Sequence, residues 1–214
     1  MRPLLTAMMM WGLLACRPEP GDPDYPDQST MGDTGGSLIP RGPDPYEEGE
    51  RRLSVGLFYE SGFSDIVEIN DKDTHYYIYD STYTQSADTL DVVEGREAAV
   101  LTHGTRGWFG GGLTWDVPRD LSGWDTMYVS MKAVDPSLED VAIHFTGGGT
   151  EGVASLVDYG WQTDGEWHHL EIPLADYTAQ GVSLSQVTAP FVMIGVAGAD
   201  GAELKIDNLY FTGE

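Results

Sequence analysis

Basic residues are scarce in this chain. Its 214 residues include 11 Lys and Arg against 35 Asp and Glu, which gives a formal net charge of −24 at pH 7. A surface this acidic repels the phosphates of nucleic acids and the headgroups of anionic lipids. The composition therefore excludes a nucleic-acid-binding protein, and it excludes membrane adsorption other than through a covalent anchor.

Cysteine is almost absent, and apolar runs are short. Cys16 is the only cysteine, so no disulfide can form within the chain, and stability must come from an apolar core and from any bound metal ion. The apolar run from Leu4 to Leu14 follows Arg2. It is too short to span a bilayer as a mature helix, and its charged start is typical of a secretory signal peptide.

The end of that run resembles a bacterial lipobox. Leu13-Leu14-Ala15-Cys16 has leucine at position −3, a small residue at −1 and cysteine at +1. The resemblance implies that residues 1–15 are a lipoprotein signal peptide and that Cys16 is diacylated, so the mature protein would be lipid-anchored in the cell envelope. Arg17, where an aspartate would retain a lipoprotein at the inner membrane, favours the outer membrane. The alternative is an ordinary signal peptide that happens to contain a cysteine.

Motifs of the common enzyme classes are missing. The sequence has no GxSxG elbow, HExxH zinc motif, P-loop or dinucleotide fingerprint. His168 and His169 are adjacent, but neighbours in a strand point to opposite faces and do not share a zinc ion. We therefore expect no catalytic residues. A glycosidase acid–base pair such as Glu60 and Asp207 is the alternative that the many carboxylates leave open.

What is present divides into two parts after the signal. Residues 16–50 are rich in Pro, Asp, Gly and Ser and poor in apolar residues, which predicts a disordered tether behind the acylated Cys16. Residues 51–214 are of a size for one domain with a sizeable core.

Alternation of apolar and polar residues runs through residues 51–214. It is clearest from Thr126 to Val134, where Met127, Val129 and Met131 share one face, and it predicts a central strand of an antiparallel sheet. Ten further strands are expected at 53–59, 75–79, 90–93, 97–102, 107–115, 141–146, 152–156, 168–174, 191–196 and 204–211. A turn near Leu184–Val187 is the most helical segment. The pattern predicts an all-β protein with an antiparallel β-sandwich.

Four segments of this domain carry a family resemblance. They are PRDLSGWDT at 118–126, DGEWHHLEIPL at 164–174, GVSLSQV at 181–187 and LKIDNLYF at 204–211. In sequence and order they resemble the galactose-binding-like jelly rolls of non-catalytic carbohydrate-binding modules. The resemblance implies a jelly-roll sandwich and a poly- or oligosaccharide ligand.

Sugar recognition needs aromatic faces on which a pyranose ring stacks, and polar side chains for its hydroxyls. The expected ligand-binding residues are Trp108, Trp115, Tyr159 and Trp161, with Asp158 and Gln162. Further aromatic candidates are Tyr76, Tyr77, Tyr79 and Tyr83. Gly110, Gly111 and Gly112 follow Trp108 and either leave backbone open to a ligand or permit a bulge. Core packing is the alternative for any single aromatic residue, and it is expected for Trp124 and Trp167.

The family resemblance also implies a structural calcium ion. Its ligands would be Asp207 and Glu60, the latter within a Tyr59–Gly62 segment that resembles the first-strand signature of the family, with backbone carbonyls completing the shell. The alternative is that Asp207 accepts a hydrogen bond from a turn N–H group while Glu60 is solvated.

These features together predict a monomeric, acyl-anchored lipoprotein that binds glycan without catalysis. The alternative is a structural or protein-interaction domain that keeps the scaffold without a sugar site. The two differ in whether the four principal aromatic residues lie exposed around one surface or are scattered and buried.

Overall fold

The computed structural model describes residues 51–55, 65–67 and 73–213. The predictions about the signal peptide, Cys16, the tether and Glu60 lie outside these residues. Within them, no helix is long and apolar enough to cross a membrane.

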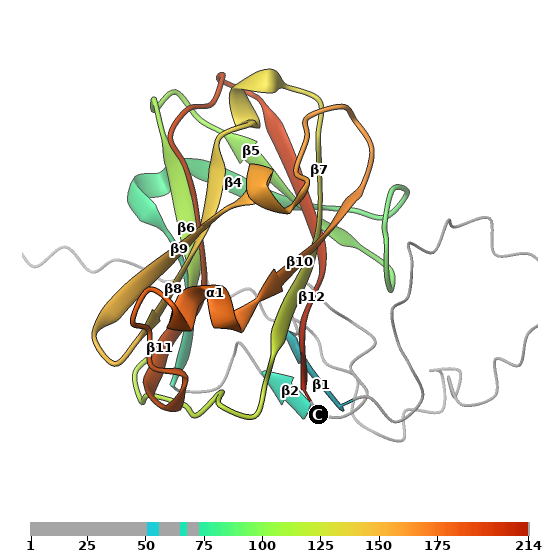
Figure 1. Cartoon of the computed structure of the whole chain (residues 1–214). Helices are drawn as coiled ribbons and strands as arrows, with labels where there is room; N and C mark the ends of the chain where they lie inside the picture. The colour runs from blue at the N-terminus through green and yellow to red at the C-terminus, as the bar shows by residue number, and fades with distance from the viewer. Residues whose placement is uncertain (1–50, 56–64, 68–72, 214) are drawn as a thin grey trace, which may run out of the picture. The chain divides into compact units, whose positions relative to one another are not determined.

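The strands form two sheets (Figure 1). The seven-stranded sheet contains β1 (Arg51–Val55), β2 (Asp65–Val67), β4 (Tyr83–Asp88), β5 (Ala98–His103), β7 (Thr126–Ala133), β10 (His168–Pro173) and β12 (Glu203–Gly213). The five-stranded sheet has the order β3 (Thr74–Ile78), β6 (Phe109–Trp115), β11 (Val187–Gly195), β8 (Val141–Gly147) and β9 (Thr150–Ser155). Every pair is antiparallel except β1 with β2. The prediction of an all-β antiparallel sandwich is confirmed.

Strand β12 joins the parts of the seven-stranded sheet. It pairs with β7 on one side, and on the other with β5 through its first half and with β1 through its second half. The register shifts between Asp207 and Tyr210, where Asn208 has a left-handed φ of 58°. β7 lies between β10 and β12, so the predicted interior position of the Thr126 strand is correct.

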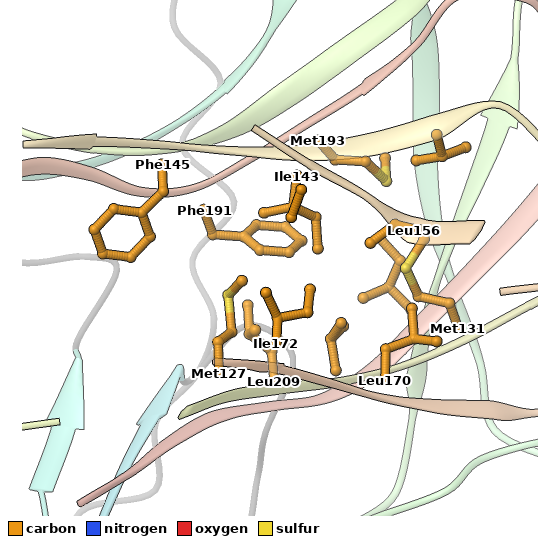
Figure 2. Close-up of a cluster of buried hydrophobic side chains, with 14 of the residues drawn as sticks. Met127, Met131, Ile143, Phe145, Leu156, Leu170, Ile172, Phe191, Met193 and Leu209 are labelled. Atoms are coloured by element: carbon orange, nitrogen blue, oxygen red, sulfur yellow. The ribbon is translucent and has the colours of Figure 1, made fainter. Parts of the chain in front are cut away.

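The core lies between the two sheets (Figure 2). Alternation places Ile143, Phe145, Phe191 and Met193 on the inner side of the five-stranded sheet, and Met127, Met131, Leu170, Ile172 and Leu209 face them from the other sheet. All of these side chains are at most 1% exposed. Burial of this apolar surface is the main favourable term for folding.

Short helical segments connect the strands. They are η2 (Tyr79–Ser81), η3 (Pro136–Leu138), η4 (Leu156–Tyr159), α1 (Leu174–Thr178) and η5 (Leu184–Gln186). The helical turn expected near Leu184 is therefore present. α1 follows β10 and packs against β9, so it lies where the two sheets meet at one edge (Figure 1).

The strand predictions differ from the structure at three places. Residues 90–93 are not a strand, because side chains bind the backbone there instead of a neighbouring strand: Asp88 Oδ1 accepts from Leu90 N–H and Asp207 Oδ2 accepts from Val93 N–H. β4 was not expected, because its exposed residues show no apolar alternation. The three-residue β2 is also additional.

The loop at 89–97 covers the part of the outer face of the seven-stranded sheet around Lys132, Lys205 and Asp207. Asp91 accepts hydrogen bonds from Lys205 Nζ at 2.6 Å and from the Trp167 indole at 2.9 Å, and it forms an ion pair with Lys132 at 3.1 Å. Val93 is buried in this loop. The face that the loop covers is therefore occupied by the protein itself.

Candidate functional site

The outward side chains of the five-stranded sheet form the surface that we call the five-strand face. Strand register places five residues in one row across it, in the order Tyr77, Gly112, Val192, His144 and Val153. Their chain neighbours point inward to the core, because side chains alternate along a strand. The row therefore runs from an aromatic residue on β3 to polar and apolar residues on β8 and β9.

Aromatic rings gather at the β3 and β6 side of the five-strand face. Tyr77 is 47% exposed, and His75 lies beside it with 5.8 Å between ring centroids. Tyr79 and Trp108 meet over Gly110: a β-carbon at that position would lie 3.0 Å from Cδ2 of Tyr79 and 3.1 Å from Cζ3 of Trp108. Both rings are half-buried, so each keeps some surface open to a ligand.

Strand β6 lacks side chains where these rings gather, and each glycine has a steric reason. A β-carbon on Gly111 would overlap the hydroxyl of Tyr83, which is buried in the core. One on Gly112 would overlap the β11 backbone at Phe191 and Val192. The result is a stretch of sheet surface on which a flat ligand can approach the backbone closely.

The opposite side of the five-strand face is polar. His144 Nδ1 on β8 lies 3.0 Å from Oε1 of Glu151 on β9, and the Glu151 side chain is 57% exposed. The pKa of the Tyr79 phenol is raised above its ordinary value, first by burial and then by the negative charges of Glu151 and of Tyr77 when it is ionised. The field of Glu151 therefore reaches the aromatic side of the face.

A second histidine–carboxylate pair lies at the end of β3. His75 Nε2 is 3.0 Å from Oδ2 of Asp116, which directly follows β6. This face thus combines rings, which offer flat apolar surface, with two groups of hydrogen-bonding side chains. That combination suits a ligand that has both C–H faces and hydroxyl groups.

The outer face of the seven-stranded sheet carries a serine, a histidine and an aspartate, but no catalytic triad. Ser130 Oγ lies 3.0 Å from His169 Nδ1, yet Ser130 is only 1% exposed. Asp207 uses both carboxylate oxygens to accept backbone N–H groups. A nucleophile needs access to substrate, and the buried Ser130 has none.

Burial corrects two of the predicted sugar-binding residues. Trp161 is 2% exposed, and its indole N–H donates to the Leu138 carbonyl at 3.0 Å. Trp115 is 4% exposed and is covered by the Arg119 guanidinium, 4.7 Å from the ring centroid. Neither ring offers a free face to a sugar, so the prediction that Trp115 and Trp161 bind the ligand is wrong. The four principal aromatic residues are not exposed together around one surface, which by that criterion favours the alternative for this set of residues, and a sugar site must use other rings.

The remaining predicted residues fall in two places. Trp108 is on the five-strand face. Tyr159 and Asp158 are in η4, with the exposed Gln162 three residues beyond Tyr159, and the Tyr159 hydroxyl donates to Asp176 Oδ2 of α1 at 2.8 Å. Burial, together with Asp176, raises the pKa of Tyr159 to about 12. The Tyr159–Asp176 hydrogen bond links two connecting segments, η4 and α1, and not the five-strand face.

Asp207 behaves as an acceptor that is satisfied by the protein. Its Oδ2 accepts from Val93 N–H at 2.7 Å and from Glu94 N–H at 3.1 Å, and its Oδ1 accepts from Asn208 N–H at 2.8 Å. Among residues 73–213 no group of three His, Cys, Asp or Glu side chains could hold a metal ion. Because Glu60 lies outside the described residues, the calcium site stays a prediction.

Sequence reasoning missed His144 and Glu151. The alternation in VAIHFTG at 141–147 is clear and places His144 outward. What the sequence does not contain is the register of β8 with β9, which brings Glu151 next to it. Among aromatic residues, Tyr77 was a candidate, but the partnership of Tyr79 with Trp108 depends on the turn at η2.

Comparison with known proteins gives structural neighbours only. No family model matches the chain, and no curated protein matches it. A family 30 carbohydrate-binding module of a cellulosomal cellulase of Clostridium thermocellum is similar with a TM-score of 0.51 and 22% identity, over 65% of this chain and 90% of that one. A second family 30 module has a TM-score of 0.50 and 23% identity, over 61% and 74% respectively. The domain therefore has the β-sandwich jelly-roll fold of these modules.

Proposed function

We propose that this protein binds a poly- or oligosaccharide on the five-strand face, without catalysis. The observation that carries the proposal is the cluster of Tyr77, Tyr79 and Trp108 rings beside the side-chain-free surface of β6. A pyranose ring would stack on the aromatic side, where its C–H groups replace water against the rings. The His144–Glu151 pair would bind hydroxyl groups from the opposite side.

Two further observations support this choice of surface. The other sheet carries its own covering loop, held by Asp91 and Asp207. The similar solved structures are named as carbohydrate-binding modules, which supports the ligand class.

The test is glycan binding by the full chain and by single ring-removal variants. Wild type is screened on a glycan array, and affinities for retained glycans are measured by isothermal titration calorimetry. We expect Tyr77→Ala, Tyr79→Ala and Trp108→Ala each to weaken binding by about 1–2 kcal/mol, roughly five- to thirtyfold. Tyr159→Ala is the matched control, because it removes an aromatic ring from η4 instead. Circular dichroism and urea unfolding check that each variant is folded.

The outcomes separate the competing ideas. A loss confined to the Tyr159 variant would move the site to η4. If no glycan is retained and tryptophan fluorescence does not respond to any polysaccharide, the proposal fails, and a structural or protein-interaction domain becomes the better explanation.

We also propose that the protein is held at the outer membrane by acylation of Cys16, which would present the domain to glycans at the cell surface. The lipobox Leu13-Leu14-Ala15-Cys16 supports this proposal. Metabolic labelling with radioactive palmitate, followed by membrane fractionation, tests it. Cys16→Ser should lose the label and leave the membrane fraction, whereas an unchanged distribution would contradict the proposal.

A structural calcium ion at Glu60 and Asp207 is a further proposal, which rests on the family resemblance and on the acidity of the chain. Calorimetric titration of chelator-treated protein with Ca²⁺ tests it. We expect one binding site and a higher unfolding temperature, both absent in Glu60→Gln. No heat and no shift in unfolding temperature would contradict it.

A further inference from the structure

The charge of the five-strand face is one-sided. The five strands that form it are all described by the structure, and they contain no Lys or Arg. Glu151 is their only carboxylate. A ligand on this face therefore meets carboxylates and no permanent cation of these strands: Glu151 within the strands, and Asp116, paired with His75, directly after β6.

Glu151 is held in place where it can act on a ligand. Its carboxylate lies 3.0 Å from His144 Nδ1, and its side chain remains 57% exposed. His144 lies on β8, in register with Val192 of β11, which is the central strand of this sheet. The contact with His144 places the carboxylate at the face, beside the row that runs from Tyr77 to Val153.

The influence of Glu151 extends across the face. The pKa of Tyr79 is raised by burial and, in addition, by the Glu151 charge, although β3 and β9 are the two edge strands of this sheet. A ligand that lies along the row from Tyr77 to Val153 passes His144 and therefore lies beside the Glu151 carboxylate, which would repel an anionic group on that ligand. The net charge of −24 adds repulsion of the same sign over longer distances.

We infer that Glu151 is a specificity-determining residue that makes the five-strand face select uncharged glycans and reject glycans with carboxylate or sulfate groups. This inference rests on the proposed function, because it concerns which glycans the same surface accepts. Removal of the charge should relax the selection without abolishing binding.

The experiment compares each neutral polysaccharide with its own oxidised form. Mixed-linkage β-glucan, xyloglucan and galactomannan are used as prepared and after partial oxidation of their primary hydroxyls to carboxylates. Affinity electrophoresis and calorimetry then give the ratio of neutral to oxidised affinity for the full chain. In wild type we expect the oxidised form to bind at least tenfold more weakly at low salt.

Glu151→Gln keeps the size and hydrogen-bonding ability of the side chain and removes the charge. We expect it to lower the ratio of neutral to oxidised affinity by about three- to tenfold at low ionic strength, as Coulomb repulsion over several ångströms predicts. Because the same side chain bonds ligand hydroxyl groups in the proposed site, the neutral form should itself bind more weakly, by up to about fivefold, so the ratio is the quantity that tests the inference. The difference should vanish near 1 M salt, where screening acts over about 3 Å.

Two control variants locate the effect. Glu171→Gln removes an exposed carboxylate from β10 on the other sheet, so it should leave the ratio unchanged. Arg106→Gln removes the basic residue nearest to Trp108 along the chain, which is exposed. Arg106→Gln should not strengthen binding of the oxidised form, and a fall in the ratio like that of Glu151→Gln would show that the effect is not specific to Glu151.

The outcomes distinguish this inference from the proposed function. If wild type binds none of the neutral polysaccharides or any other array glycan, both fail. If it binds a neutral glycan but binds the oxidised form equally well, or if Glu151→Gln leaves the ratio unchanged, only the role of Glu151 is overturned.

Discussion

Asp207 offers a sharp test of how the 89–97 loop is held against the seven-stranded sheet. The residue is 1% exposed, and burial raises its carboxyl pKa from the ordinary value of 3.8 to about 7. The three backbone N–H donors, from Glu94, Val93 and Asn208, act in the opposite direction and lower the pKa. Asp207→Asn removes the titration while keeping a side chain of the same shape.

The direction in which stability changes with pH follows from proton binding. Between pH 3.8 and 7 the folded protein retains a proton on Asp207 that the unfolded chain releases, so stability falls as pH rises through this window. A shift of about three pKa units corresponds to at most about 4 kcal/mol, of which about 2.5 kcal/mol would be lost between pH 5 and pH 8. Local opening of the loop admits water to the carboxylate, and we therefore expect a loss of about 1–2 kcal/mol.

The assay is urea unfolding followed by tryptophan fluorescence at pH 5, 6, 7 and 8 and constant ionic strength. The stability advantage of wild type over Asp207→Asn should shrink by about 1–2 kcal/mol from pH 5 to pH 8. Asp91→Asn is the control: burial opposes ionisation of Asp91, but bonds from Lys205, Trp167 and Lys132 bring its pKa down to about 2. The stabilisation by ionised Asp91 is lost only below the ordinary aspartate pKa of 3.8. The difference in the free energy of unfolding between wild type and Asp91→Asn should therefore stay constant from pH 5 to pH 8. A constant gap for Asp207→Asn as well would refute the reasoning and show that Asp207 is ionised throughout.

Three further changes test the packing around the site. Gly111→Ala should destabilise the fold by about 2–3 kcal/mol in urea unfolding, because its methyl group would overlap the buried Tyr83 hydroxyl; a neutral effect would contradict the steric role of this glycine. Trp161→Phe should cost about 1–3 kcal/mol, since the Leu138 carbonyl loses its indole donor, and it should leave glycan affinity within twofold because the ring is buried. Gln180→Leu should lower the free energy of unfolding by less than about 1 kcal/mol, since water replaces its two hydrogen bonds to the Val153 backbone on edge strand β9. The edge of β9 is then unprotected, so light scattering should show more aggregation of this variant.

Strands in which apolar and polar residues alternate were predictable from the sequence, and strands without this alternation were missed. Thr126–Ala133 and Val141–Gly147 bury every second residue on one side of the core, and a period of two is visible without a structure. Tyr83–Asp88 has one buried and four exposed residues. Residues 90–93 lie in the loop on the outer side of the seven-stranded sheet, and the valines of this loop are buried against the sheet. Their local apolar pattern cannot be distinguished from that of a strand.

The site was only partly predictable because exposure of an aromatic ring is decided by its surroundings. Trp108 directly precedes β6 and Trp115 is its last residue, and the sequence gives no reason to treat them differently. The two positions are seven residues apart, an odd number, so Trp115 points inward with Phe109 and Leu113, while Trp108 points outward. Trp161 is buried in the core, where its indole N–H donates to the Leu138 carbonyl. The residues next to Trp161 in the sequence do not indicate this contact.

The choice between the two sheet faces depends on charge distribution as much as on rings. On the seven-stranded sheet, Lys132 and Lys205 stand on the outer face and draw in Asp88 and Asp91, which brings the intervening loop across the sheet. The five-stranded sheet has no basic residue in its strands, so it gives the chain's many carboxylates no partner apart from its histidines. The net charge of the protein is −24, so most of its loops are acidic. Strands without Lys or Arg do not attract such loops, and the five-strand face therefore stays uncovered. The same lack of cations that leaves the rings accessible is what we expect to restrict them to uncharged ligands.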